Sequence, residues 1–139
     1  LNNNVKVLPL ICYEVIFPKT TSLSKKNFDL IVNITNDAWF GTSRGPYQHL
    51  ALAKIRTVLE GKYMIRVANT GISTIIDYDG NIVDKINLGK SGVIDKKLVL
   101  YKKNTLYSYL GDYIFYALLI VLVLILINIK FKYGLKNKI

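Results

Sequence analysis

The residues whose side chains could best take part in a reaction stand together early in the chain, at Cys12, Tyr13 and Glu14. Residues 5–8, before them, are mostly apolar and predict a β-strand that ends near the thiol. Pro18 closes the short segment that follows. A side chain at a strand end projects out of the sheet, and backbone N–H groups at such turns can bind an oxyanion. Because a thiolate is a nucleophile, this stretch could carry covalent catalysis.

Two interpretations of Cys12 remain open on these residues alone. A lone cysteine between Ile11 and Tyr13 is more often a small buried hydrophobe than a reactive thiol. Glu14 could hydrogen-bond the surrounding turn or orient a proton-transfer partner. A single cysteine excludes an internal disulfide and a cysteine-cluster zinc site, and a single histidine excludes a histidine-rich metal site. The sequence therefore predicts neither a metal nor a cofactor.

A second polar cluster follows the next predicted strand. Residues 28–34 are a near-continuous apolar run, which predicts a central strand covered on both faces. The loop behind it contains Asn36, Asp37, Trp39 and Phe40. One interpretation is a turn with core aromatics. The other is a pocket wall beside Cys12, because neighbouring parallel strands bring their C-terminal loops together.

A helix is predicted over residues 47–60, since Pro46 suits a first turn and Gly61 suits the position after a helix. Its apolar stripe at helical spacing predicts the face toward the core and consists of Leu52, Ile55, Val58 and Leu59. Arg56 falls outside that stripe. His49 is interpreted as a capping or packing residue rather than as a catalytic base.

The remaining segments complete an α/β pattern. Residues 20–27 predict a short helix or loop. Further strands are predicted over residues 63–68, 72–77, 82–86 and 93–100. Asp79 and Gly80 predict a hairpin with a type I′ turn. This order favours an α/β sheet with antiparallel additions.

The C-terminal part predicts a membrane anchor. Residues 113–129 contain no charge, and a stretch of this length and composition is typical of a transmembrane helix. Lysines follow it and Asp112 precedes it, which predicts a cytoplasmic C-terminus and a body on the periplasmic side. The net charge of +10 favours nucleic acid or an anionic membrane as partner. The apolar run decides for the membrane and against nucleic acid.

Four stretches, taken together and in order, carry a resemblance to a known family: residues 12–14, 36–41, 48–50 and 66–73. They resemble the nitrilase, or carbon–nitrogen hydrolase, superfamily, and more closely its membrane branch, the apolipoprotein N-acyltransferases. The implied fold is the C-terminal half of a nitrilase-type αββα sandwich followed by one transmembrane helix. The expected organisation is a nitrilase-like part over 1–100, a linker over 101–112, the membrane helix over 113–129 and a basic cytoplasmic tail over 130–139.

The resemblance implies an activity and roles for residues. Cys12 matches the nucleophile of a Glu–Lys–Cys triad, which takes a fatty acyl group from a phospholipid as a thioester. The acyl group then passes to the N-terminal cysteine amine of a diacylated apolipoprotein. Glu14 matches a supporting position in the active site. The expected substrate-binding residues are Tyr13, Asn36, Asp37, Trp39 and Phe40. The implied location is the bacterial inner membrane.

The chain departs from the family pattern in one respect. The triad's Glu and Lys lie upstream of the Cys-Tyr-Glu stretch, and no sequence long enough to hold them precedes Leu1. We therefore expect a C-terminal fragment that is inactive alone and that exposes an apolar sheet face. Two alternatives remain. One is a membrane-tethered amidase of the nitrilase type, in which water replaces the amine acceptor. The other is an inactive truncated remnant.

Overall fold

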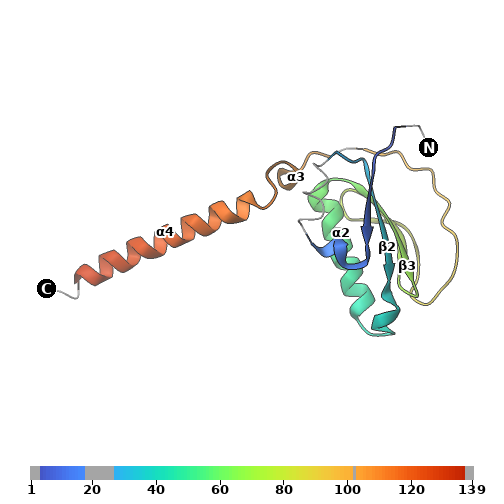
Figure 1. Ribbon diagram of the computed structural model, residues 1–139, viewed down its shortest axis with the longest axis horizontal. Helices are drawn as coiled ribbons and strands as arrows, with labels where there is room; N and C mark the ends of the chain where they lie inside the picture. The colour runs from blue at the N-terminus through green and yellow to red at the C-terminus, as the bar shows by residue number, and fades with distance from the viewer. Residues whose placement is uncertain (1–3, 18–26, 102, 137–139) are drawn as a thin grey trace. The chain divides into compact units, whose positions relative to one another are not determined.

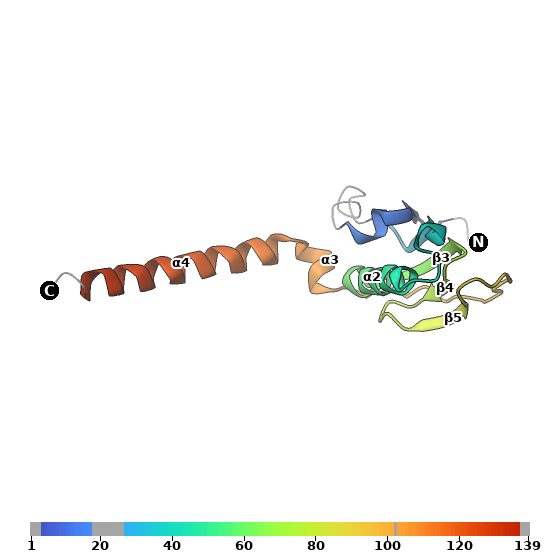
Figure 2. The ribbon, with the colours of Figure 1, turned by 90° about the horizontal axis from the view of Figure 1, so that it is seen from below.

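The computed structural model describes residues 4–17, 27–101 and 103–136, and the chain divides into two compact units, Leu1–Tyr109 and Leu110–Ile139. Most of the first segment predicted as a helix or loop, residues 20–26, lies outside the described residues. The first unit contains a five-stranded sheet whose strands follow one another in chain order (Figures 1 and 2). Its strands are β1 (Val7–Ile11), β2 (Leu30–Asn36), β3 (Tyr63–Asn69), β4 (Ser73–Ile76) and β5 (Ile82–Ile86).

The direction of the strands confirms the predicted α/β architecture. β1, β2 and β3 are parallel, whereas β4 and β5 are added as antiparallel strands. Parallel neighbours require a crossover, and α2 (Gly45–Glu60) connects β2 to β3. Pro46 lies in its first turn, and Gly61 ends it in a left-handed conformation with φ of 64°. The bounds predicted for this helix are therefore close to those observed.

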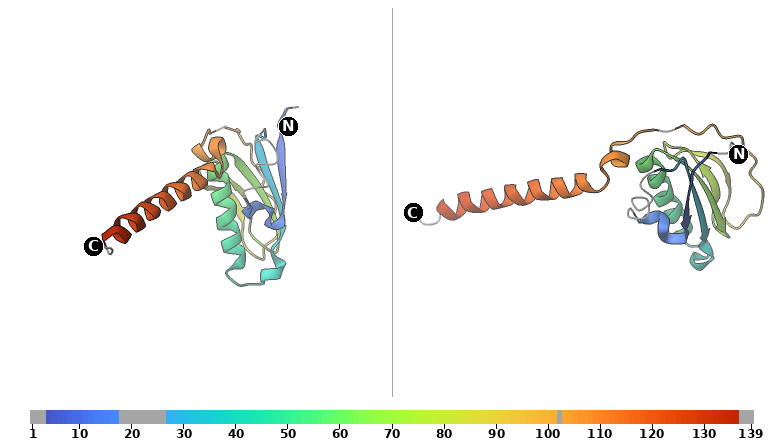
Figure 3. Two further views of the ribbon diagram at one scale, coloured as in Figure 1. Left: turned by 60° about the vertical axis from the view of Figure 1, so that its left-hand side comes forward. Right: turned by 45° about the horizontal axis from the view of Figure 1, so that its top comes forward.

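The predicted core face of α2 is wrong. Leu52, Ile55 and Val58 are exposed, whereas Arg56 is buried. Figure 3 shows α2 lying against the sheet. The buried residues of α2 include Leu50 and Ala53, together with polar residues that have partners of their own. The Nε of Arg56 donates to the Val15 carbonyl at 3.1 Å, and its Nη1 lies 3.6 Å from the Glu60 carboxylate. A buried charge is tolerated only when it is paired in this way, so these partners fix the orientation of the helix.

The two faces of the sheet differ in their cover. Leu10, Ile31, Met64 and Ile76 are buried on the α2 side and form the centre of the core. On the other face, Val7, Ile34 and Val67 each expose about half of the side chain. The prediction that the second strand is covered on both faces is wrong for its C-terminal end, where nothing in the described part of the chain covers Ile34, although Leu30 on the same face is buried. An apolar, open sheet face agrees with one half of a sandwich.

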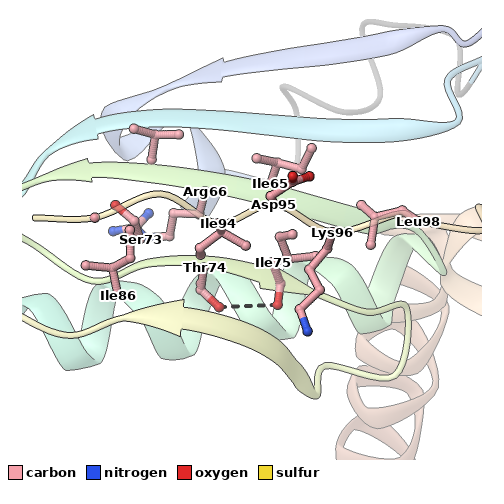
Figure 4. Close-up of a pocket in the computed structure, with 12 residues that line it drawn as sticks. Ile65, Arg66, Ser73, Thr74, Ile75, Ile86, Ile94, Asp95, Lys96 and Leu98 are labelled. Carbon is pink, nitrogen blue, oxygen red and sulfur yellow. Dashed lines mark hydrogen bonds between the residues drawn. The ribbon is translucent and has the colours of Figure 1, made fainter. Parts of the chain in front are cut away.

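Two smaller predictions are also corrected. The Asp79–Gly80 hairpin exists, but only Gly80 has a positive φ, of 82°. The Gly80 N–H bonds the Asp77 carbonyl at 3.1 Å, so a three-residue loop replaces the type I′ turn. Residues 93–100 form no strand. They instead contribute to one wall of a cavity of about 320 Å³ whose other walls come from β3, β4 and β5 (Figure 4).

The second unit is dominated by α4 (Tyr113–Lys136). Its Tyr113–Lys130 portion is long and apolar enough to cross a membrane, judged by length and composition. The short helix α3 (Leu106–Leu110) falls within the segment predicted as a linker.

Candidate active site

Cys12 stands directly after β1, where the chain turns into the 3₁₀ helix η1 (Cys12–Ile16). Its φ of 51° is in the left-handed region, which costs a residue with a side chain on the order of 1–2 kcal/mol. The Asn33 side chain holds the strained turn, because its Nδ2 donates to the carbonyls of Leu10 at 3.1 Å and Cys12 at 3.3 Å. Glu14 closes the turn by accepting the Ile11 N–H at 2.6 Å. The thiol is only half-buried at this position.

The surroundings of the sulfur favour the thiolate. The hydroxyl of Thr35 lies 3.5 Å from Sγ, and this hydrogen bond is the main cause that lowers the pKa of Cys12 below its ordinary value. Backbone N–H groups of Asn36 and Tyr13 lower the pKa further, while partial burial and the Asp37 carboxylate oppose the shift. A thiol with a lowered pKa and an open side is the combination typical of a nucleophilic cysteine.

The predicted polar loop after β2 is the 3₁₀ helix η2 (Asp37–Phe40), and it lies beside the thiol as expected. Asn36 caps it by accepting the Ala38 N–H at 3.2 Å. The Asp37 side chain is fully buried, and its Oδ1 lies 2.9 Å from Nδ1 of His49. The same oxygen accepts the Thr35 hydroxyl at 3.1 Å. Asp37 therefore acts on the thiol through its hydrogen bond with Thr35, whose hydroxyl also lies near Sγ.

Arg66 of β3 joins the two turns. Its Nη2 donates to Asp37 Oδ2 at 2.8 Å, and its Nη1 donates to Oδ1 of Asn33. One buried guanidinium thus supports both the residue that holds the Cys12 turn and the residue that contacts Thr35. Burial lowers the pKa of Arg66, and the Asp37 carboxylate opposes that shift. The Nη2 atom also lies 3.1 Å from His49 Nδ1, so the three side chains form one cluster.

Aromatic rings cover this cluster on the thiol side. Tyr13 stacks on His49 with ring centroids 4.9 Å apart and planes inclined by 15°. Phe40 lies 6.0 Å from Tyr13 and 6.2 Å from His49. Trp39 is 85% exposed, and Tyr13 is 44% exposed. Tyr13, which follows Cys12 in the chain, and η2 therefore present an exposed aromatic rim.

The structure places most of the predicted site residues at the C-terminal ends of β1 and β2, in η1 and η2, whereas Trp39 points its ring largely into the open. Sequence reasoning missed three members of the cluster, Asn33, Thr35 and Arg66, and interpreted His49 only as a capping or packing residue. A signal was present: Asn33 and Arg66 are polar residues within apolar strands. They are opposite each other in the β2–β3 register, so each can be the hydrogen-bond partner of the other. Among the described residues, no group of three His, Cys, Asp or Glu side chains could hold a metal ion.

The cavity in Figure 4 shares Arg66 with the cluster beneath Cys12. Its apolar walls include Ile65, Ile75, Ile86, Ile94 and Leu98. None of the residues predicted for the site, all of which the structure describes, lines it.

A half-buried cysteine with a lowered pKa therefore stands at the end of a parallel strand, and comparison with known families identifies the class of protein. The carbon–nitrogen hydrolase model matches residues 3–101, and the chain belongs to that family. Among its relatives, the apolipoprotein N-acyltransferase of Rhodopseudomonas palustris is 42% identical over 130 residues, which are 94% of this chain and 24% of that protein. The enzyme of the same name from Rickettsia bellii is 44% identical over 129 residues, covering 90% and 25%. The chain thus spans about a quarter of the length of these relatives.

Solved structures support the same fold. A carbon–nitrogen hydrolase from Helicobacter pylori G27 superposes with a TM-score of 0.54 at 11% identity, over 63% of this chain and 38% of that one. Nit3 of Saccharomyces cerevisiae, a member of branch 10 of the nitrilase superfamily, gives 0.50 at 23% identity, over 61% and 34%. The nitrilase-type fold class predicted from the sequence is therefore confirmed.

Proposed function

We propose that this chain is the part of an apolipoprotein N-acyltransferase that carries the acyl-accepting thiol, Cys12. The observation that carries the proposal is the setting of this thiol: a strained strand end, half-buried, with hydrogen-bond donors that stabilise the thiolate. The names of the relatives supply the substrate class, since they are apolipoprotein N-acyltransferases. The acyl donor proposed is a phospholipid, and the acceptor is a diacylated apolipoprotein.

The proposed reaction has two steps that share the thiol. First, the Cys12 thiolate attacks the ester carbonyl of the phospholipid. The C–S bond forms, the ester C–O bond breaks, and the leaving alkoxide takes a proton. Second, the amine of the acceptor's N-terminal cysteine attacks the thioester. The amide C–N bond forms, the C–S bond breaks, and the amine loses its proton to a base.

The thiolate has two functions in this scheme, as nucleophile in the first step and as leaving group in the second. A lowered pKa suits the second function, because a stable thiolate leaves more readily. The family resemblance assigns proton transfer and part of the oxyanion stabilisation to a Glu and a Lys that match no residue of this chain. Full activity is therefore proposed for a protein that supplies both, and the chain alone is expected to be inactive.

The exposed rim is proposed to hold the acyl chain. Tyr13 directly follows Cys12 and its ring lies 6.0 Å from that of Phe40, while Trp39 of η2 is exposed. An acyl chain that packs on such rings gains about 0.8 kcal/mol for each CH₂ removed from water. Asn36 is exposed at the same edge and offers an amide to polar parts of the substrate. Glu14 is proposed to support the turn, in accord with its bond to the Ile11 N–H.

A place in the bacterial inner membrane is part of the proposal. The Tyr113–Lys130 portion of α4 would span the bilayer, with residues 1–100 on the periplasmic side. The support for this direction is the lysine-rich sequence after residue 129, since such residues favour the cytoplasm. Cys12 is the only thiol, so it can report the topology. A membrane-impermeant maleimide should label it in spheroplasts and not in inverted vesicles. Labelling in inverted vesicles alone would contradict the proposed direction.

The activity can be tested in a chimaera in which this chain replaces the matching quarter of the Rickettsia bellii enzyme. We expect the chimaera to acylate a diacylated lipopeptide on its N-terminal amine and the Cys12→Ala variant to be inactive. Val93→Ala is a suitable control, because Val93 is 93% exposed and belongs to neither the site nor the sheet. Release of ammonia from small amides without lipopeptide acylation would favour the amidase alternative and contradict the proposal.

A further inference from the structure

The hydroxyl of Thr35 lies between two acceptors. Its Oγ1 is 3.5 Å from Sγ of Cys12 and 3.1 Å from Oδ1 of Asp37. Thr35 itself is 5% exposed, so water does not compete freely for the group. A hydroxyl has one proton to donate, and it can therefore serve only one of the two acceptors at a time.

The two acceptors differ in the hydrogen-bond donors that they keep when the Thr35 hydroxyl turns away. Asp37 keeps the Arg66 Nη2 donor at 2.8 Å on one oxygen. His49 Nδ1 lies 2.9 Å from the other oxygen and donates to it only in the tautomer with a proton on Nδ1, whereas the contact with Arg66 Nη2 at 3.1 Å needs Nδ1 as the acceptor. Arg66 also compensates the charge of the carboxylate. The hydroxyl can therefore leave Asp37 without uncovering a buried charge.

The sulfur, by contrast, has a charge that changes during the reaction. As a thiolate it is anionic and attracts a donor strongly, because hydrogen bonds to charged groups are the stronger ones. As a thiol or thioester it is neutral and a weak acceptor. The preferred partner of the hydroxyl is then the Asp37 carboxylate. The state of the sulfur therefore selects the direction of the Thr35 O–H bond.

We propose that Thr35 is a positioning residue for acyl transfer, whose hydroxyl turns from Asp37 to the Cys12 sulfur when the sulfur becomes anionic and turns back when it is acylated. The O–H bond of Thr35 rotates and does not break. Arg66 makes the rotation possible by holding Asp37 in both states. The inference rests on the proposed role of Cys12 as the nucleophile.

The other groups around the sulfur do not have this freedom. Tyr13 of η1 and Asn36 of β2 present backbone N–H groups, which are fixed by the chain. Asp37 of η2 and Arg66 of β3 are the charged groups that act on the sulfur, and they are paired with each other. His49 of α2 contacts that pair. Glu14, the carboxylate of η1, bonds the Ile11 N–H.

The test is the pH profile of Cys12 alkylation by iodoacetamide in the full chain, kept in detergent. Only the thiolate reacts, and Cys12 is the only thiol, so the midpoint of the profile reports its pKa. In Thr35→Val the midpoint should move to higher pH, and alkylation at neutral pH should slow by about tenfold, as the loss of a hydrogen bond to a charged group implies. Thr35→Ser keeps the hydroxyl and should restore the wild-type profile.

Thr57→Val is the matched control. Thr57 is also buried, but its hydroxyl bonds the Lys54 carbonyl within α2, so this variant should keep the wild-type profile. Equal midpoints in wild type and Thr35→Val would overturn the proposal. Circular dichroism checks whether the variants fold. If Thr35→Val does not fold, Thr35→Ala decides: its midpoint must lie above that of the wild type, and equal midpoints would overturn the proposal.

Alkylation needs neither phospholipid nor lipoprotein, so the two proposals fail separately. A Thr35-dependent profile without any thioester on Cys12 would contradict the acyl transfer and support the coupling of Thr35 to the thiolate. A thioester on Cys12 together with an alkylation profile that is the same in wild type and Thr35→Val would support the acyl transfer and contradict the coupling of Thr35 to the thiolate.

Discussion

The Arg66 guanidinium lies 2.8 Å from the Asp37 carboxylate, and neither side chain has any exposed surface. Both belong to the cluster beneath Cys12, and each has further partners on a different element. A buried ion pair of this kind does not by itself stabilise a fold, because removing both charges from water is costly. Removal of one partner, however, leaves the other charge buried and unpaired.

We expect Asp37→Asn to lower the free energy of unfolding by about 3–5 kcal/mol, because it leaves Arg66 as an uncompensated buried cation. Denaturant unfolding of the full chain in detergent measures the change. Lys96→Met is the control, since Lys96 and Asp84 are 3.6 Å apart and both about half exposed. That variant should change the free energy by no more than about 1 kcal/mol. Equal effects of the two substitutions would mean that the buried pair has no special structural role.

Gly71 lies against the same carboxylate, so a larger residue at this position also tests the role of the cluster. A Cβ added there would overlap Asp37 Oδ2 and lie 2.8 Å from the Ala68 Cβ, so Asp37 would have to move. Overpacking of this kind costs about 1–3 kcal/mol, and Gly71→Ala should destabilise the chain by that amount. At Gly92 the nearest atom would be at 3.5 Å, an ordinary contact. A Gly92→Ala variant as unstable as Gly71→Ala would contradict the explanation.

The strands and the helix bounds could be predicted because their signals are local. Pro46 and Gly61 mark the ends of α2, and the strand before Cys12 places the thiol at the edge of the sheet. The inner face of α2 could not be predicted in this way. Its apolar stripe predicts the wrong core face, because Arg56 and His49 lie among the buried residues of the helix.

The reason is that their partners are distant in sequence. His49 meets Asp37, and Arg56 meets the Val15 carbonyl, 41 residues away. The helical periodicity of a sequence shows only how its apolar residues are spaced. It contains no information on hydrogen-bond partners elsewhere in the chain. The same limit applies to Thr35, whose relation to Cys12 exists only because β1 and β2 are neighbours.

The open face of the sheet predicts self-association. Ile34 and Val67 are each 53% exposed on the face opposite α2, and apolar sheet surface without cover is an association hazard. We expect the isolated segment 1–100 to associate at micromolar concentration, and Ile34→Thr with Val67→Thr to reduce this in sedimentation experiments. Val93→Thr, a change at an exposed position outside the sheet, should have no effect. A cooperative, monomeric melt of the unaltered segment would contradict the prediction.

The thiol should make stability depend on pH in the alkaline range. Because the Thr35 hydroxyl and nearby N–H groups lower the pKa of Cys12 from its ordinary value of about 9.0, the folded state binds this proton less tightly than the unfolded state. The resulting stabilisation is complete above that value and is lost as the pH falls through the lower pKa of the folded protein. The melting temperature of wild type relative to Cys12→Ala should therefore rise between neutral pH and pH 9. A constant or falling difference would contradict the lowered pKa.

The most direct test of the central claim is the intact mass of the chimaera after incubation with a phospholipid that carries a labelled acyl chain. We expect one acyl group on the wild-type protein, located at Cys12 and released by neutral hydroxylamine, which cleaves thioesters. The Cys12→Ala variant should remain unmodified. An acyl group that persists in the Ala variant, or its absence from a folded wild-type chimaera that still acylates lipopeptide, would contradict the account.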